Sequence, residues 1–531
     1  MGTNMAAATN VTDTLPSIPN DVRPPITNYS PSMWGDAFTS FSFDDKVQEK
    51  YGEAIEELKE EARSMVMSKG STTIEKLILV DTIERLGVGY HFEQEIEDQL
   101  REIFRLQSED KERQDNYDLF TTALQFRVLR QHRYSVSCNV FNKFKDEDGE
   151  FEKTLTSDAK GLLSLYEAAN VRIHGEDVLE DAVAFTSHHL NRMVQELEPP
   201  LQCQVKRALE QPVHRGVQRL EARHYISFYE RNELKNDILL KLAKLDFNYL
   251  QNLYKKELHD LSSLSTYARI AISKSVLMLT IMDDTYDNYA TLDEADLFTE
   301  ILEKWDINEI DRLPDYMKII YKFILDLYEE YEVEAAKQGK LFAVPYAKEA
   351  VKQIGKAYNR HTQWFMGGQM PTYEEYMVNT VVTSCIYVFL TVGIPGLKSA
   401  SKEAIDWVMS EPNKALIAST RVCRHADDIG SDERENRGGN IPTAVDCYAK
   451  QYGVSKEETV DKFKQLCENA WKDFNTEWST EISTVSKDMM EQLLNYARVA
   501  EVHYRNGRDA YTHPQKVAGE IAALFMHPIA I

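Results

Sequence analysis

KSVLMLTIMDDTYDNY, residues 274–289, is an apolar run that ends in three aspartates. On a helix, Asp283 and Asp287 are four residues apart and Asp284 and Asp287 are three apart, so the carboxylates share one face. Like charges at this spacing repel one another, and acids at the end of an apolar helix are costly unless a cation binds them. Hard divalent cations take carboxylate oxygens as ligands. The stretch therefore predicts a helix that ends in a metal site, with a solvated helix end as the alternative.

A second acidic run, RHADDIGSDERE at 424–435, also follows apolar sequence. Asp427, Ser431 and Glu435 stand at i, i+4 and i+8, which is one helical face carrying only oxygen ligands. Two such sets favour Mg²⁺ over zinc, and Mg²⁺ usually completes its shell with water and substrate phosphates. A phosphorylated substrate is therefore expected. A calcium-binding EF-hand is excluded, because Thr285 and Asn288 stand where an acidic or amide ligand and a glycine are needed.

The rest of the chain also predicts helices. Val47, Tyr51, Ile55 and Leu58 follow one another at helical spacing, and comparable segments continue with few breaks. Glycine (22) and proline (16) are scarce for 531 residues, and alternating strand patterns are missing. We expect an all-α protein with an extended, Pro- and Asn-rich arm at 1–35, an N-terminal helical domain at 36–235 and a C-terminal helical domain at 236–531.

Charge, cysteine usage and hydropathy limit the partners and the compartment. The net charge of −25 repels phosphate backbones, so nucleic-acid binding is not expected. Six scattered cysteines are typical of a reducing compartment, and the first 22 residues carry no Lys or Arg, so we expect a cytosolic protein without a targeting leader. Residues 376–397 are uncharged, but their hydroxyls, Gly393 and Pro395 favour a buried, kinked helix over a membrane span.

Taken together, DDTYD and DDIGSDERE resemble the DDxxD motif and the second metal motif of plant class I terpene synthases. Further stretches occur in the same order as in that family: RPPITNYSPSMWGD in the arm, GEDVLEDAVAFTSHHL at 175–190, RLEARHYISFYE, LAKLDFNYLQ, QWFMGGQMPTYEEYM and DAYTHPQKV. The resemblance covers nearly the whole chain and is strongest to the sesquiterpene synthase branch.

The resemblance implies a C-terminal class I terpenoid synthase fold and an N-terminal α-barrel-like domain that is a catalytically silent relic. It implies that three Mg²⁺ ions, or Mn²⁺ in their place, hold the diphosphate of farnesyl diphosphate, which ionises to a carbocation that cyclises or rearranges. The implied metal ligands are Asp283, Asp284, Asp287, Asp427, Ser431 and Glu435. Arg424 matches a diphosphate-binding arginine, although a plain ion pair is the alternative. A monomer is expected.

The resemblance also implies which residues line the substrate cavity. These residues are Thr383, Ser384, Cys385, Ile386 and Tyr387 on the kinked helix, and Tyr504, Asp509 and Tyr511 near the C-terminus. Plain core packing is the alternative for each of them. Three other functions remain open: a prenyl-diphosphate synthase, disfavoured because Ser431 and Glu435 replace a second DDxxD, a monoterpene synthase that uses geranyl diphosphate, and a helical scaffold without catalysis.

One departure from the family stands out. An Arg-x-Arg loop and a helix with a cavity-lining Trp are expected upstream of the DDxxD motif. Arg269 is the only arginine between Leu240 and Asp283, and no Trp lies between Trp34 and Trp305. We expect that one loop and one helix are missing here and that activity is impaired, as in a splice form, an incomplete gene model or a degenerate copy.

Overall fold

The structure is a computed structural model that describes Trp34 and residues 43–68, 70–109, 116–259, 267–437, 443–480 and 485–531. Apart from Trp34, the predicted arm at 1–35 lies outside this range. The described residues form helices joined by short turns, and among them the β structure is limited to one bridge between Lys145 and Phe151. The predicted all-α class is confirmed.

Contacts between residues divide the chain into two compact units. The first unit contains Tyr267–Met409 and Ser431–Phe463, and the second contains the N-terminal helices, Ser410–Gly430 and Lys464–Ile531. The division of the sequence into domains near residue 235 stays a prediction. Two helices, α18 (Lys414–Arg437) and α20 (Lys456–Ser479), contribute residues to both units.

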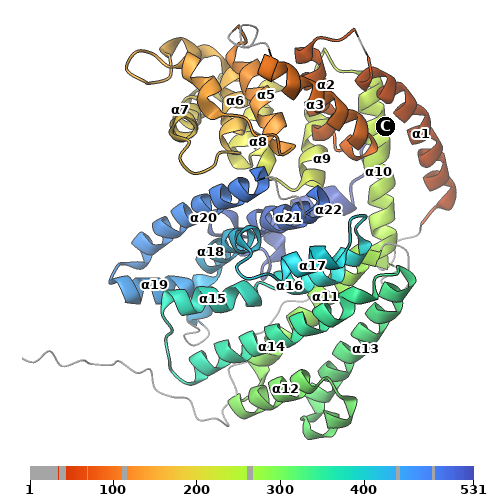
Figure 1. The fold of residues 1–531 in the computed structure, drawn as a ribbon, viewed down its shortest axis with the longest axis vertical. Helices are drawn as coiled ribbons and strands as arrows, with labels where there is room; N and C mark the ends of the chain where they lie inside the picture. Colours follow the sequence, from red (N-terminus) through yellow and green to blue (C-terminus); the bar gives the residue numbers. More distant parts are fainter. Residues whose placement is uncertain are drawn as a thin grey trace, which may run out of the picture. The chain divides into compact units, whose positions relative to one another are not determined.

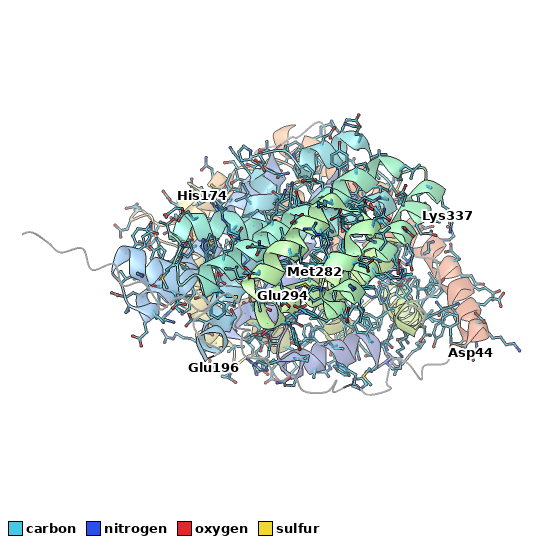
Figure 2. The ribbon with its side chains drawn as sticks, turned by 90° about the horizontal axis from the view of Figure 1, so that it is seen from below. Asp44, His174, Glu196, Met282, Glu294 and Lys337 are labelled. Carbon is cyan, nitrogen blue, oxygen red and sulfur yellow. The ribbon has the colours of Figure 1, made fainter. Side chains whose placement is uncertain are left out.

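The second unit is a set of amphipathic helices whose buried faces form a large apolar core and a smaller, separate cluster that includes residues of α8. In α1, the Asp44 carboxylate caps the first turn by accepting from the amides of Lys46 and Val47. Figure 2 labels this residue. Ile55, Leu58, Ala62 and Val66 then bury one stripe of α1, which packs on α10. The helices of this unit in Figure 1 are α1 (Asp45–Val66), α2 (Thr73–Arg85), α3 (Glu93–Glu109), α5 (Leu119–Gln131), α6 (Ala159–Ala169), α7 (Asp177–Met193), α8 (Leu201–Glu210), α9 (Gln218–Tyr229), α10 (Asp237–His259), α21 (Lys487–Tyr504) and α22 (Ala518–Phe525).

Ion pairs between two buried arginines and a partly exposed carboxylate connect distant segments within the second unit. The Glu468 carboxylate on α20 accepts from Arg172 Nη2 at 2.9 Å and from Arg215 Nη2 at 2.8 Å. Burial raises the pKa of Glu468, but the two guanidiniums more than offset this and hold the pKa at about 2. His214, beside Arg215, contacts Asn475 Oδ1 through its Nε2 at 2.9 Å. These contacts join α20 to the segments that follow α6 and α8.

The first unit has its own apolar core, in which α14 packs against α12, α15 and α16, and α11 packs against α13 and α16. The side chain of Thr291 caps α12 in a capping box with Glu294, the residue labelled on this helix in Figure 2. The helices of this unit are α11 (Tyr267–Asp284), α12 (Leu292–Lys304), α13 (Asp315–Lys337), α14 (Val344–Met366), α15 (Tyr373–Thr383), α16 (Ile386–Gly393), α17 (Lys402–Val408) and α19 (Ala444–Tyr452).

The uncharged stretch at 376–397 is broken, as predicted. Helix α15 ends at Thr383, and α16 begins at Ile386 after Cys385 takes a left-handed φ of 66°. A 3₁₀ turn follows at Ile394–Gly396. By length and composition Tyr373–Gly396 is apolar enough to span a membrane, but 61% of its most apolar window is buried inside the protein. The predicted kink and burial are therefore confirmed.

Candidate active site

The first acidic run lies where α11 passes into a π turn. Asp283 and Asp284 are the last residues of α11, and Asp287 lies in the π turn Thr285–Tyr289, which closes with a hydrogen bond from Ala290 N to Thr285 O at 2.8 Å. The spacing argument treated all three carboxylates as one α-helical face, and for Asp287 this geometry is wrong. π turns are rare and occur often at functional sites.

Core contacts hold this turn in place. Tyr286 is fully buried, and its hydroxyl lies 2.9 Å from Thr299 Oγ1. Thr362 Oγ1 on α14 donates to Tyr286 O at 3.1 Å. Met282, labelled in Figure 2, is also fully buried directly before the aspartates. The backbone of the motif is thus anchored in the core, while Asp283 is exposed.

Asn288 joins two of the three carboxylates. Its Nδ2 donates to Asp287 Oδ1 at 2.6 Å and to Asp284 Oδ1 at 3.2 Å. This amide was not predicted as part of the site, although its place next to Asp287 in the sequence offered a signal. The contact fixes Asp284 and Asp287 relative to each other.

The second acidic run is part of α18. Arg424 donates through Nη1 to Asp427 Oδ2 at 2.7 Å and through Nη2 to Asp428 Oδ1 at 2.8 Å. The Asp428 side chain is only 2% exposed, so the buried partner of Arg424 is a residue that the sequence did not single out. Ser431 is buried one turn beyond Asp427. Glu435 belongs to α18 by its backbone, but its side chain lies outside the described residues.

Two of the C-terminal residues predicted for the site, Tyr504 and Asp509, lie near α18. Burial and the negative charge of Asp427 raise the pKa of Tyr504, so its hydroxyl stays protonated. Asp509 is buried, and its Oδ1 accepts from the Thr512 amide at 2.9 Å. Tyr511 is 54% exposed. The structure therefore brings Tyr504 close to the Asp427 end of α18.

Gly430 makes the close approach of α18 to this segment possible. A Cβ atom at position 430 would lie 2.8 Å from Arg508 O and 3.5 Å from Asp509 N. No pattern in the sequence singled out this glycine. Its lack of a side chain is the reason that the backbone before Asp509 packs directly on α18.

The kinked helix presents a polar break inside an apolar core. Cys385 Sγ lies 3.3 Å from the Tyr358 hydroxyl, and Ser384 Oγ donates to Val381 O at 2.6 Å. Thr383 and Tyr387 are half-buried, whereas Ile386 is fully buried in the core. A left-handed residue other than glycine is strained, and such strain gathers at functional sites.

The donor set fits a hard divalent cation that also binds substrate. Within the described residues no group of three or more His, Cys, Asp or Glu side chains is gathered around one point that could hold an ion. The predicted ligands with described side chains offer carboxylate and hydroxyl oxygens only, as Mg²⁺ prefers. Mg²⁺ usually binds one or two protein carboxylates, with water and substrate phosphates completing its shell.

Comparison with known proteins identifies the family. The model "Terpene synthase, N-terminal domain" matches residues 33–209, and "Terpene synthase family, metal binding domain" matches residues 262–473. Gamma-cadinene synthase from Ocimum basilicum is 48% identical, with 97% of this chain and 99% of the relative covered. The chain belongs to the terpene synthase family. Tau-cadinol synthase from Lavandula angustifolia is 45% identical to this terpene synthase over 96% of the chain and 98% of the relative.

Solved structures agree with the fold. Limonene synthase with 2-fluorolinalyl diphosphate superposes with a TM-score of 0.88 at 29% identity, covering 95% of this terpene synthase and 99% of the other chain. Isoprene synthase from grey poplar, in complex with three Mg²⁺ ions and dimethylallyl-S-thiolodiphosphate, gives 0.84 at 30% identity, covering 92% and 98%. The predicted family and fold are confirmed, and the metal-binding domain makes a divalent metal the cofactor of this terpene synthase.

The alignments also show that this terpene synthase is shorter inside. The alignment with the basil relative runs over 549 positions, whereas 97% of this chain is about 515 residues, so about 34 positions have no residue here. The lavender relative aligns over 544 positions with 96% of this chain, or about 510 residues, and again leaves about 34. The loss of one loop and one helix between Leu240 and Asp283 stays a prediction.

Proposed function

We propose that this terpene synthase is a Mg²⁺-dependent sesquiterpene synthase that ionises farnesyl diphosphate to a carbocation, which then cyclises or rearranges. The observation that carries the proposal is the acidic run of α11, held by a buried π turn so that oxygen ligands stand at the end of an apolar core helix. The names of the relatives, gamma-cadinene synthase and tau-cadinol synthase, support a substrate of this size.

The proposed metal ligands are Asp283, Asp284 and Asp287 on one side and Asp427, Ser431 and Glu435 on the other. The grey poplar relative, solved with three Mg²⁺ ions, supports three ions of the same kind, with Mn²⁺ as a substitute. When bound, such ions neutralise charge on a leaving diphosphate. Arg424 orients Asp427 through its ion pair, and we also assign it a contact with the diphosphate.

We assign most of the remaining predicted residues to the wall of the cavity that would surround the carbocation. The ring face of Tyr504 would stabilise positive charge, an interaction worth about 0.5–2 kcal/mol. Thr383, Ser384 and Cys385 line the break of the kinked helix, while Asp509 and Tyr511 belong to the C-terminal segment. Ile386 is fully buried, which favours core packing as its role.

We place the protein in the cytosol as a monomer that binds neither nucleic acid nor membrane. All six cysteines are free thiols, which suits a reducing compartment. The net charge of −25 opposes binding to nucleic acids and to anionic lipid surfaces.

The test is diphosphate release by the purified chain from farnesyl and from geranyl diphosphate, with and without Mg²⁺. We expect release from farnesyl diphosphate that a chelator abolishes and that Asp283→Asn lowers about 100-fold or more, because a metal ligand is lost. The matched control is Asp293→Asn at the start of α12, an aspartate outside the proposed ligand set. Release that persists without a divalent metal would refute the proposal, and a preference for geranyl diphosphate would assign the monoterpene reaction instead.

A further inference from the structure

One amide bridges two of the three proposed metal ligands of the first acidic run. Asn288 lies in the π turn Thr285–Tyr289, and its Nδ2 donates to Asp284 Oδ1 at 3.2 Å and to Asp287 Oδ1 at 2.6 Å. The amide nitrogen, rather than the amide oxygen, faces the carboxylates because both neighbours accept hydrogen bonds and the NH₂ group carries two donors. Each of the two carboxylates therefore has one oxygen engaged by the same nitrogen.

Core contacts fix the backbone that carries this amide. The π turn closes with Ala290 N donating to Thr285 O at 2.8 Å. Tyr286, two residues before Asn288, is fully buried, and its carbonyl oxygen accepts from Thr362 Oγ1 at 3.1 Å. The bridge between the two carboxylates therefore stands on a rigid part of the fold, as a group that positions metal ligands requires.

We propose that Asn288 is a positioning residue that makes this terpene synthase select Mg²⁺ over larger divalent cations, an inference that rests on the proposed function. Ca²⁺ takes about six to eight oxygens at about 2.3–2.6 Å and accepts both oxygens of one carboxylate, whereas Mg²⁺ requires a near-octahedral shell at about 2.0–2.1 Å. Chelation by both oxygens of Asp284 or of Asp287 would displace the Asn288 amide. Ligation through one oxygen of each carboxylate keeps both hydrogen bonds, and it suits Mg²⁺.

The amide also holds two like charges together before a metal binds. Both Oδ1 atoms lie within 3.2 Å of one nitrogen. Without the two donors, the carboxylates of Asp284 and Asp287 repel each other and turn apart, and an arriving ion has to bring them back together. Removal of a partner that orients a metal ligand typically lowers metal affinity by about 10–100-fold.

The first test compares the Mg²⁺ requirement of Asn288→Ala and Asn288→Leu with that of the wild type. Leucine has nearly the size of asparagine but neither donor. In diphosphate release from farnesyl diphosphate, we expect the half-saturating Mg²⁺ concentration to rise about tenfold or more, while kcat at saturating Mg²⁺ stays within about threefold. Asn308→Ala is the matched control and should leave both values unchanged, because Asn308 Nδ2 donates to Asp306 Oδ1 at 2.8 Å in a turn outside the proposed ligand set.

The second test measures metal binding without turnover. Bound Mn²⁺ is followed by EPR in the absence of substrate and is displaced with Mg²⁺ or with Ca²⁺, and the signal that Asp283→Asn loses defines the site. For both Asn288 variants, we expect the ratio of the Ca²⁺ to the Mg²⁺ concentration at half displacement to fall about tenfold or more. A turn that is merely loosened would weaken both ions alike and leave this ratio unchanged.

The outcomes separate the inference from the proposed function. An unchanged Mg²⁺ requirement in the variants, or an unchanged ratio of Ca²⁺ to Mg²⁺, overturns the role of Asn288 alone. Absence of Mg²⁺-dependent diphosphate release by the wild type overturns the proposed function together with it.

Discussion

Substitution of Gly430 by alanine tests how the second acidic run is held. The new Cβ would lie 2.8 Å from Arg508 O, and since ordinary contacts begin at 3.4 Å, α18 and the Arg508 backbone must separate by about 0.6 Å. Overpacking of this kind costs about 1–3 kcal/mol, because a backbone carbonyl cannot rotate away as a side chain can. Alanine recovers about 1 kcal/mol through its higher helix propensity. We expect a net loss of at most about 2 kcal/mol in unfolding free energy.

The same displacement acts on the proposed chemistry. Asp427 lies one turn before Gly430, and Asp509 follows Arg508 directly, so the two sides of this contact carry residues of the proposed site. A misplacement of about 1 Å can cost about 100-fold in rate. For a shift of about 0.6 Å, we therefore expect kcat/KM for diphosphate release to fall by about tenfold or more.

Gly519→Ala provides the matched control, because no atom lies within 4 Å of a Cβ at that position in α22. This variant should keep full activity and an unchanged or slightly higher melting temperature. Both variants are compared by urea unfolding and by diphosphate release with farnesyl diphosphate. If Gly430→Ala matches Gly519→Ala in both measurements, the close packing on Arg508 does not position Asp427, and the reasoning is refuted.

Three further predictions concern charged and titratable side chains of the second unit. Asp427→Asn should lower diphosphate release about 100-fold at an unchanged melting temperature. Asp428→Asn removes a buried partner of Arg424 and should cost about 2 kcal/mol of unfolding free energy in urea. Equal stability of the two variants would contradict the separate roles assigned to Asp427 and Asp428. Burial and the charge of Arg498 lower the pKa of His214 to about 3. The unfolded side chain titrates near 6.5, so this group should lower the unfolding free energy of the wild type by about 2 kcal/mol between pH 7.5 and 5. The unfolding free energy of His214→Gln should fall correspondingly less, as measured by urea unfolding at both pH values. An equal loss in the variant would rule out His214 as a source. Glu468→Gln should lower the melting temperature at pH 7, because Arg172 and Arg215 lose a charged acceptor, and this difference should shrink as the pH falls from about 4.5 towards 2 and the wild-type carboxylate is protonated. A difference that persists at low pH in calorimetry would argue against the ion pairs as its source.

Local patterns in the sequence were enough to predict the helices and the kind of ligand atoms that the two acidic runs offer. The apolar spacing of 274–282 predicts α11, and the oxygen-only runs at its end and in α18 predict a hard divalent cation. The polar and glycine-containing stretch at 376–397 predicts a break, which the structure has at Cys385. Each of these features depends on residues that lie within a few helical turns of one another, so a single stretch of sequence contains all the information needed.

Tertiary packing decided how those residues are presented. Asp287 lies in a π turn because Tyr286 is fixed by Thr299 and Thr362, the latter 76 residues away in the chain. Asp428 rather than Asp427 is the buried partner of Arg424, although the two aspartates are adjacent in sequence. Helical spacing determines which residues share a face. Which face is buried, and how far its side chains lie from their partners, depends on contacts between segments that only the folded chain brings together.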